Sequence, residues 1–138
     1  MRFEIPFYGH ENIRSLHPKT IEITTESNLT TNGDCIVGVQ ASAGCNDLPE
    51  KMKALLQNSK SKVSCTITVK DFSFTTKGRG DERLVLTNPH DIVIRKSSFV
   101  CPRTLATNCD ASSDAIPRNM IKALQDPDVK GIFAIEVT

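Results

Sequence analysis

The chain has 138 residues, of which 38% are apolar and 24% charged, and its net charge is +1. A chain of this length can bury roughly two-thirds of the surface that its unfolded form exposes, so it needs no metal or disulfide to fold. Nucleic-acid-binding domains usually carry a basic excess, so the net charge does not support that class of protein and leaves open only a local basic patch.

The first half of the chain predicts three strands, a helix and a fourth strand. The helix is expected from Asp47 to Asn58, because its apolar residues recur at i, i+4, i+7 and i+8 and Pro49 stands in its first turn. The apolar stripe consists of Leu48, Met52, Leu55 and Leu56. Strands are expected near residues 2–8, 20–24, 35–41 and 63–69, of which 20–24 and 63–69 alternate apolar and polar residues.

The second half predicts a similar series of elements. A helix is expected from Asp114 to Gln125, with Pro117 in its first turn and Pro127 after its end. Its apolar stripe has the same spacing and consists of Ile116, Met120, Ala123 and Leu124. Strands are expected near residues 71–77, 83–87, 91–95, 103–109 and 132–135.

The similar halves reflect an internal repeat in the sequence. Residues 49–69 share seven identities with residues 117–137 at an offset of 68, and residues 2–23 share six with residues 73–94 at an offset of 71. The identities fall on turn, cap and core positions in the same order. We interpret them as a duplicated β-β-β-α-β unit. The alternative is two analogous halves with chance identities.

Neither half, about 2–69 or 73–137, has enough elements to bury its apolar face alone. We therefore expect residues 1–138 to form a single domain in which the halves pack about a pseudo-two-fold axis. The predicted fold is mainly β with some α content. It is a β-sandwich or a barrel-like sheet, with the two helices covering an end or a face.

No apolar run approaches the ~20 residues that a membrane span needs. The N-terminal segment 1–6 contains an acid and a proline where a signal peptide would be apolar. The chain has five cysteines, an odd number, and without a secretion signal this is typical of free thiols in a reducing compartment. We expect a cytoplasmic protein without disulfides.

Four motifs suggest a family. They are Gly-His-Glu-Asn at 9–12, Gly-Asp-Cys-Ile-Val-Gly-Val at 33–39, Asn-Pro-His-Asp-Ile-Val-Ile-Arg-Lys-Ser at 88–97, and Arg-Thr-Leu at 103–105. Together they resemble an archaeal family known as domain of unknown function 371, over nearly the whole chain. The resemblance implies a mainly β, sandwich-type fold in a small archaeal protein, and it implies no activity, cofactor or partner.

The densest basic cluster consists of Arg95, Lys96 and Arg103. Arg95 and Lys96 end one predicted strand, and Arg103 begins another after a short loop that also carries hydroxyl groups. If the three cations converge on one rim, they can bind phosphate or carboxylate. The alternative is a solvated strand end with a salt bridge to Asp91 or Asp34.

The histidines suggest a second site. His17 and His90 could face each other across the pseudo-two-fold axis, and with Asp34 or Asp81 they would suffice for acid–base chemistry or metal binding. The alternative is that these two and His10 make ordinary hydrogen bonds at the surface or at strand edges. No His-x-His or His-Glu-x-x-His spacing is present, so we predict no metal site.

The cysteines are most simply buried free thiols. Only Cys101, close to Arg103 and Lys96 in the sequence, has the basic neighbours that lower the pKa of a thiol.

Our leading hypothesis is a non-catalytic module that binds an anionic ligand or partner at a site formed by Arg95, Lys96 and Arg103. The alternative is an enzyme with a His/Asp acid–base or metal site near the interface of the halves. A third hypothesis, a purely structural subunit, would require a large exposed apolar patch.

Overall fold

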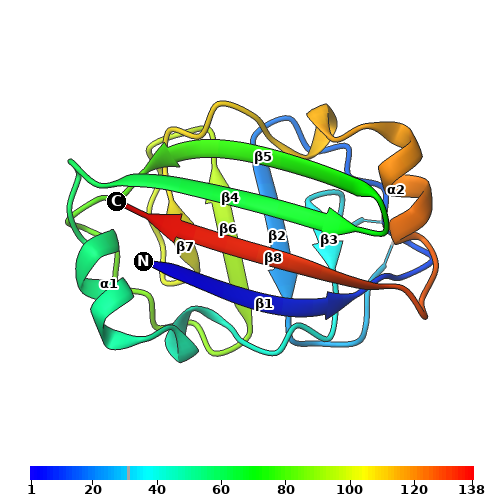
Figure 1. The fold of residues 1–138 in the computed structure, drawn as a ribbon, viewed down its shortest axis with the longest axis horizontal. Helices are drawn as coiled ribbons and strands as arrows, with labels where there is room; N and C mark the ends of the chain where they lie inside the picture. The colour runs from blue at the N-terminus through cyan, green and yellow to red at the C-terminus, as the bar shows by residue number, and fades with distance from the viewer. Residues whose placement is uncertain (31) are drawn as a thin grey trace.

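A computed structural model describes residues 1–30 and 32–138. Figure 1 labels the helices and strands. In chain order the elements are β1 (Arg2–Tyr8), β2 (Thr20–Thr24), β3 (Ile36–Gly38), the 3₁₀ turn η1 (Cys45–Asp47), α1 (Glu50–Leu56), β4 (Lys62–Val69), β5 (Phe72–Arg79), β6 (Asp91–Arg95), β7 (Thr104–Ala106), the 3₁₀ turn η2 (Ser113–Ala115), α2 (Arg118–Leu124) and β8 (Lys130–Val137).

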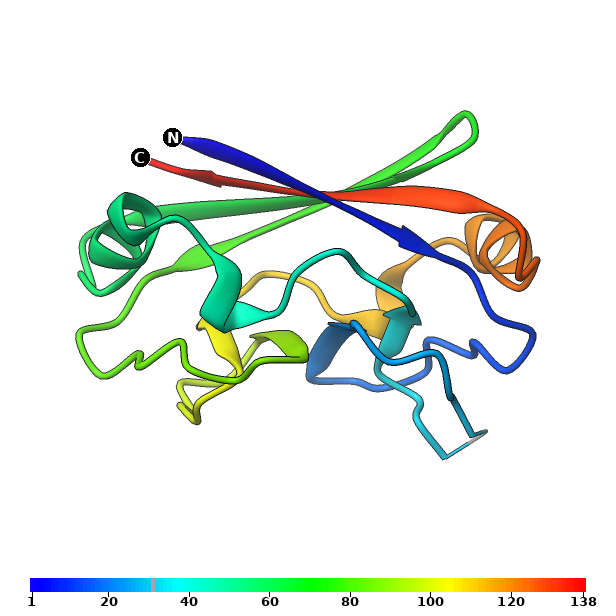
Figure 2. The same ribbon diagram turned by 90° about the horizontal axis from the view of Figure 1, so that it is seen from below.

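The strands form two four-stranded sheets. The long-strand sheet has the order β1-β8-β4-β5 and is antiparallel throughout. The short-strand sheet has the order β3-β2-β6-β7, with an antiparallel central pair and parallel outer pairs. The two sheets form separate layers, and α1 and α2 lie at opposite ends (Figure 2). The mainly β prediction with two helices is confirmed, whereas the barrel-like sheet is wrong because the strands are divided between two sheets.

The long-strand sheet buries one face, because successive side chains of a strand point to opposite sides. In β4 the odd-numbered residues from Val63 to Val69 are buried, while Lys62 and Thr68 are exposed. In β6 residues 92–94 are all buried, so this strand is covered on both faces. The apolar core is mainly aliphatic, with Phe7 and Phe133 as its fully buried aromatic side chains.

Both helices are shorter than predicted because proline sets their starts. The residue before a proline is driven out of the helical conformation. Accordingly, Leu48 and Ile116 are extended, with ψ of 146° and 129°, and each helix begins just after its proline. Asp47 therefore lies in η1, where its carboxylate accepts a hydrogen bond of 2.9 Å from the backbone of Gly44.

The strand predicted at 83–87 is wrong. Leu84 and Leu86 are buried, as in a strand, but Leu86 has a φ of 54°, which interrupts an extended backbone. The carbonyl of Leu84 accepts a hydrogen bond of 2.9 Å from the Gln57 side chain instead of a ladder bond. The matching loop of the first half behaves alike, since Gln125 donates to Ile13 at 2.8 Å.

Candidate functional site

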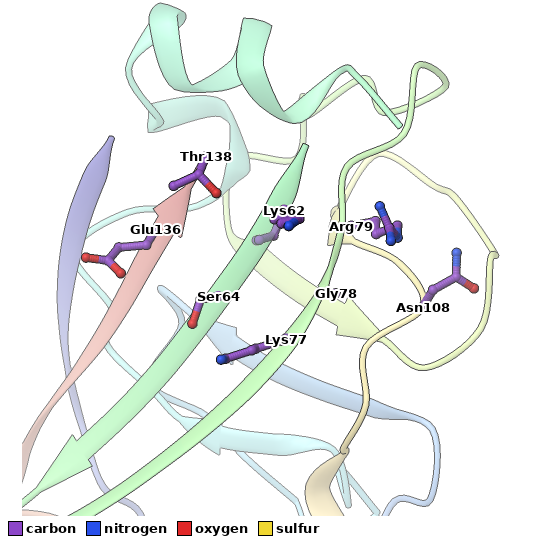
Figure 3. Close-up of a pocket in the computed structure, with 9 residues that line it drawn as sticks. Lys62, Ser64, Lys77, Gly78, Arg79, Asn108, Glu136 and Thr138 are labelled. Atoms are coloured by element: carbon purple, nitrogen blue, oxygen red, sulfur yellow. The ribbon is translucent and has the colours of Figure 1, made fainter. Parts of the chain in front are cut away.

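A hollow of about 470 Å³ lies at one end of the long-strand sheet, where β4 begins and β5 and β8 end. Figure 3 shows its lining residues. Three of them are the cations Lys62, Lys77 and Arg79, and Glu136 is the only acidic side chain in the lining. We call this site the basic hollow.

The strand register brings the three cations together. Lys62 of β4 lies directly opposite Arg79 of β5, and Lys77 lies two residues before Arg79 on the same face of the sheet. Like charges directly opposite each other on antiparallel strands destabilise a sheet. The fold therefore keeps an unfavourable charge pair at this position.

Carboxylates lie near these cations, and Asp110 attracts Lys77, but none of them forms a salt bridge with the three cations among the described residues. Within residues 1–30 and 32–138, no ion pair involves Lys62, Lys77 or Arg79. Glu136 pairs instead with Arg2 at 3.2 Å. Asp110 accepts hydrogen bonds from the Lys77 backbone at 3.0 Å and from a threonine hydroxyl at 2.8 Å, and these bonds lower the pKa of its carboxyl. The hollow thus keeps a net positive charge.

Gly78 brings the loop after β7 against β5. A Cβ atom at this position would lie only 2.6 Å from the carbonyl oxygen of Thr107 and 2.5 Å from the sulfur of Cys109. Without that atom, Arg79 and Thr107 exchange two backbone hydrogen bonds, of 2.8 and 2.9 Å. The close approach sets Asn108 at the edge of the hollow, beside Arg79 (Figure 3).

The other end of the same sheet lacks this concentration of charge. At the repeat offsets, Lys62, Lys77 and Arg79 correspond to Lys130, Pro6 and Tyr8. Lys130 lies opposite Tyr8 there, as Lys62 lies opposite Arg79. The two ends therefore share a backbone register but differ in charge.

The structure divides the basic cluster predicted from the sequence. Arg103 contacts two carboxylates, Glu22 at 3.5 Å and Asp91 at 3.4 Å. Arg95 donates to the Thr104 hydroxyl at 2.9 Å, and its guanidinium lies 4.8 Å from the centre of the Phe99 ring. Lys96 follows Arg95 directly and lines a second hollow together with Lys19.

Arg95 and Arg103 lie beside Cys101. The sulfur of Cys101 accepts hydrogen bonds from Arg95 at 3.3 Å and from Thr104 at 3.5 Å. Partial burial raises the pKa of Cys101, but bonds from the Thr104 hydroxyl, the Arg103 backbone and the Arg95 guanidinium outweigh it and lower the pKa from 9.0 to about 7. This thiol is therefore partly ionised at neutral pH and largely ionised at mildly alkaline pH.

Glu22 is the buried carboxylate of this region. It is 5% exposed, and it accepts a long hydrogen bond of 3.7 Å from the thiol of Cys35. Burial raises the pKa of Glu22, and the charge of Asp91 raises it further, while Arg103 opposes both. Arg103 forms ion pairs with both Glu22 and Asp91, so its charge is largely compensated within the protein.

The histidines make local hydrogen bonds at turns. His10 Nδ1 accepts from the backbone of Asn12 at 3.0 Å, and His17 Nδ1 accepts from the backbones of Lys19 and Thr20, both at 3.1 Å. In the second half, Asp81 and Asn88 accept the corresponding bonds. His10 and His17 therefore cap turns as ordinary acceptors.

The structure does not bring His17 and His90 together. His17 precedes β2, whose first residue pairs with the last residue of β6, and His90 precedes β6. The two histidines thus lie at opposite ends of a five-residue antiparallel pair, roughly 14 Å long at 3.4 Å per residue. His90 instead bonds to the hydroxyl of Thr25 at 2.8 Å, while the carbonyl of Asp34 accepts from the His17 backbone at 3.4 Å.

The described residues contain neither a metal-ligand cluster, nor a disulfide, nor a helix that could cross a membrane. In the described part of the chain, no group of three or more His, Cys, Asp or Glu side chains is arranged to hold a metal ion. All five cysteines are free thiols. None of the described helices is long and apolar enough to span a membrane.

The sequence analysis did not identify Lys62, Lys77 or Arg79. Two signals were present, since Lys62 stands on the polar side of an alternating strand and Lys77 and Arg79 are two residues apart. Their convergence depends on the register between β4 and β5, which those signals do not specify.

Comparison with known proteins gives two matches. The family model "Domain of unknown function (DUF371)" matches residues 5–138. An uncharacterised protein of the archaeon Methanocaldococcus jannaschii, MJ0206, is 40% identical over 126 residues, which cover 91% of this chain and 93% of that protein.

Proposed function

Because the chain belongs to the family described as domain of unknown function 371, a description that assigns no activity, we propose its function from the geometry: it binds an anionic ligand in the basic hollow. The observation that carries this proposal is the position of Lys62 directly opposite Arg79, with no carboxylate paired to either in the described residues. An anion bound between them would relieve a repulsion that the fold otherwise retains.

The surroundings of the hollow also favour an anion. Lys77 adds a third positive charge, and Ser64, directly opposite Lys77, offers a hydroxyl donor on the same face of the sheet. Cations together with neutral donors are the usual means of holding phosphate and carboxylate groups. The site predicted at Arg95 and Arg103 is less suitable, because those guanidinium groups already contact protein acceptors.

The test is titration of the full chain with inorganic pyrophosphate, followed by calorimetry or backbone NMR. We expect binding at low ionic strength, with the largest amide shifts in β4 and β5. One charge-assisted contact at an exposed site contributes about 1 kcal/mol, so Lys62→Ala or Arg79→Ala should each weaken binding by roughly fivefold.

The chain supplies a matched control in Lys130→Ala, since Lys130 holds the position of Lys62 at the other end of the sheet. This control should bind pyrophosphate like the wild type. If Lys62→Ala and Lys130→Ala lost the same affinity for pyrophosphate, binding would depend only on the overall charge of the protein. That result, or the absence of binding at low salt, would refute the proposal.

We also propose that residues 1–138 form one domain, a β-sandwich that arose by duplication of a β-β-β-α-β unit. The element order supports this, because three strands, a 3₁₀ turn, a helix and a strand occur twice. Each half contributes two strands to each sheet. Positive φ angles recur at the repeat offsets, in Ser15 and Leu86 and in Gln40 and Asn108.

A cytoplasmic location completes the proposal. Its support is the five free cysteines, three of them buried, which suit a reducing compartment. We do not carry forward the acid–base enzyme built on His17, His90 and Asp34, because such chemistry needs its groups within hydrogen-bond reach or one bridging water.

A further inference from the structure

A second, smaller hollow lies beside the basic hollow. It measures about 290 Å³ and is lined by Pro18, Lys19, Lys96 and Ser97. The backbone N–H of Lys96 donates to the carbonyl of Lys19 at 2.8 Å, which holds the two lysine positions next to each other. We call this site the lysine hollow.

The two hollows are joined through one hydrogen bond. Asn108 lines the basic hollow, and its backbone N–H donates to the carbonyl of Ser97 at 3.0 Å. Ser97 lines the lysine hollow. Strand pairing and backbone hydrogen bonds therefore link Lys62, Lys77 and Arg79, through Asn108 and Ser97, to Lys96 and Lys19.

This surface carries five cations, and no ion pair involves any of them among the residues that the structure describes. The acidic side chains beside the basic hollow are Glu136, which is paired with Arg2, and Asp110, whose carboxylate bonds to the strand backbone. A small anion fills one hollow, whereas an extended series of positive charges fits an extended series of negative charges.

An exposed aromatic ring lies at the lysine end. Phe99 is 58% exposed, and its backbone N–H donates to the hydroxyl of Ser97 at 3.3 Å. The guanidinium of Arg95 lies over this ring, 4.8 Å from its centre. An exposed ring beside a cationic groove is a stacking platform for unpaired bases, and an inorganic phosphate chain has no group that can use it.

We propose that the basic hollow and the lysine hollow form one track for single-stranded nucleic acid, with its phosphates along the five cations and a base against Phe99. This inference rests on the proposed function, because the basic hollow is the first part of the track. The chain's net charge of +1 is compatible with it, because the five cations of this surface outnumber Glu136 and Asp110, the acidic side chains beside the basic hollow.

The experiment measures the binding of a fluorescent single-stranded oligonucleotide of about 12 nucleotides by anisotropy, at several salt concentrations. The variant Lys19→Ala/Lys96→Ala should weaken oligonucleotide binding several-fold and leave pyrophosphate binding unchanged. Each lost phosphate contact reduces the slope of log K against log salt by about 0.7, so the double variant should be shallower by about 1.4. The control Lys51→Ala/Lys122→Ala removes two exposed lysines from the helices and should match the wild type.

Two further arms identify the ligand. Phe99→Ala should weaken binding of the oligonucleotide and leave binding of an inorganic polyphosphate of equal charge unchanged. Equal binding of both polymers by the wild type, or equal loss in the two lysine double variants, would overturn the nucleic-acid track. If pyrophosphate binds and the oligonucleotide does not, the track fails and the proposed function stands, whereas both fail if neither probe binds.

Discussion

Glu22 lies directly opposite Val93 in the antiparallel pair β2–β6. The offset that relates the first parts of the halves is 71, so each of these residues faces its own counterpart. In the long-strand sheet, Thr66 likewise lies opposite Ala134 at the offset of 68. The two pairs mark where the proposed pseudo-two-fold axis crosses the sheets, and at one of them a buried carboxylate faces a valine.

Replacing this carboxylate with an amide should stabilise the protein at neutral pH. The pKa of Glu22 is raised above its ordinary 4.5, mainly by burial. The protonated form therefore favours folding below pH ~4.5, and this contribution is lost as the pH rises through the folded-state pKa. Since Glu22→Gln is uncharged throughout, urea unfolding should show a gain over the wild type at about pH 8 that disappears at about pH 4. Glu26→Gln, at an exposed position, should show no such gain. If Glu22→Gln were less stable than the wild type at both pH 8 and pH 4, the expected stabilisation would be contradicted.

Reversing the charge of Lys62 should separate stability from binding. Lys62→Glu places a carboxylate opposite Arg79, and an opposite-charge pair across strands contributes about 0.2–1 kcal/mol. We expect the variant to unfold at higher urea concentration than the wild type and to lose pyrophosphate binding. Lys62→Ala, which only removes the repulsion, should fall between them in stability. If Lys62→Glu were less stable than the wild type, Lys62 and Arg79 would not repel each other as the register implies.

Cys101 should be the first cysteine to react with iodoacetamide. Its pKa is lowered to about 7, whereas burial raises the pKa of Cys35 to about 11 and that of Cys45 and of Cys109 to about 12. Since the thiolate is the nucleophile, its alkylation rate, followed by peptide mass spectrometry, should reach half its maximum near pH 7. Arg95→Gln should move this midpoint to higher pH. Faster labelling of any other cysteine in the native protein would contradict the assignment.

Two glycines at matching positions should tolerate no side chain. A Cβ atom on Gly9 would lie 2.3 Å from the carbonyl oxygens of Leu124 and Asp126, and one on Gly80 would lie 2.3 Å from that of Leu56. Backbone atoms cannot move aside easily, so Gly9→Ala and Gly80→Ala should each cost about 1–3 kcal/mol in urea unfolding. Gly33→Ala should cost less, because its nearest contact is the flexible end of the Leu29 side chain at 2.7 Å. An equal loss in all three would argue against contact with the backbone as the cause.

The sequence predicted the strands best where its pattern was regular. The alternation at 63–69 lies within β4, and the strand expected at 91–95 coincides with β6. It failed at 83–87, where Leu84 and Leu86 are spaced as in a strand but the backbone turns at Leu86. Apolar residues at every second position indicate which side chains are buried. They do not prove a strand, because a backbone that turns can bury the same side chains.

The candidate site was less accessible to prediction than the fold. Arg95 and Arg103 do lie near each other, around Cys101, but Glu22 and Asp91 compensate Arg103, and Lys96 lies in a different hollow. We grouped these cations because they are close in the sequence. Whether a cation is free to bind a ligand depends on the acids that contact it, and here those acids come from β2 and β6.

What the sequence determined by itself is the set of local features: alternation that buries one side of a strand, prolines that start both helices, and matching residues at two offsets. These follow from the geometry of single elements. The tertiary structure alone decided that Lys62 faces Arg79, that Glu22 faces Val93, and that Asn108 joins two hollows. Register and strand order depend on contacts between distant segments, because a shift of one residue would turn every side chain of a strand to the other face.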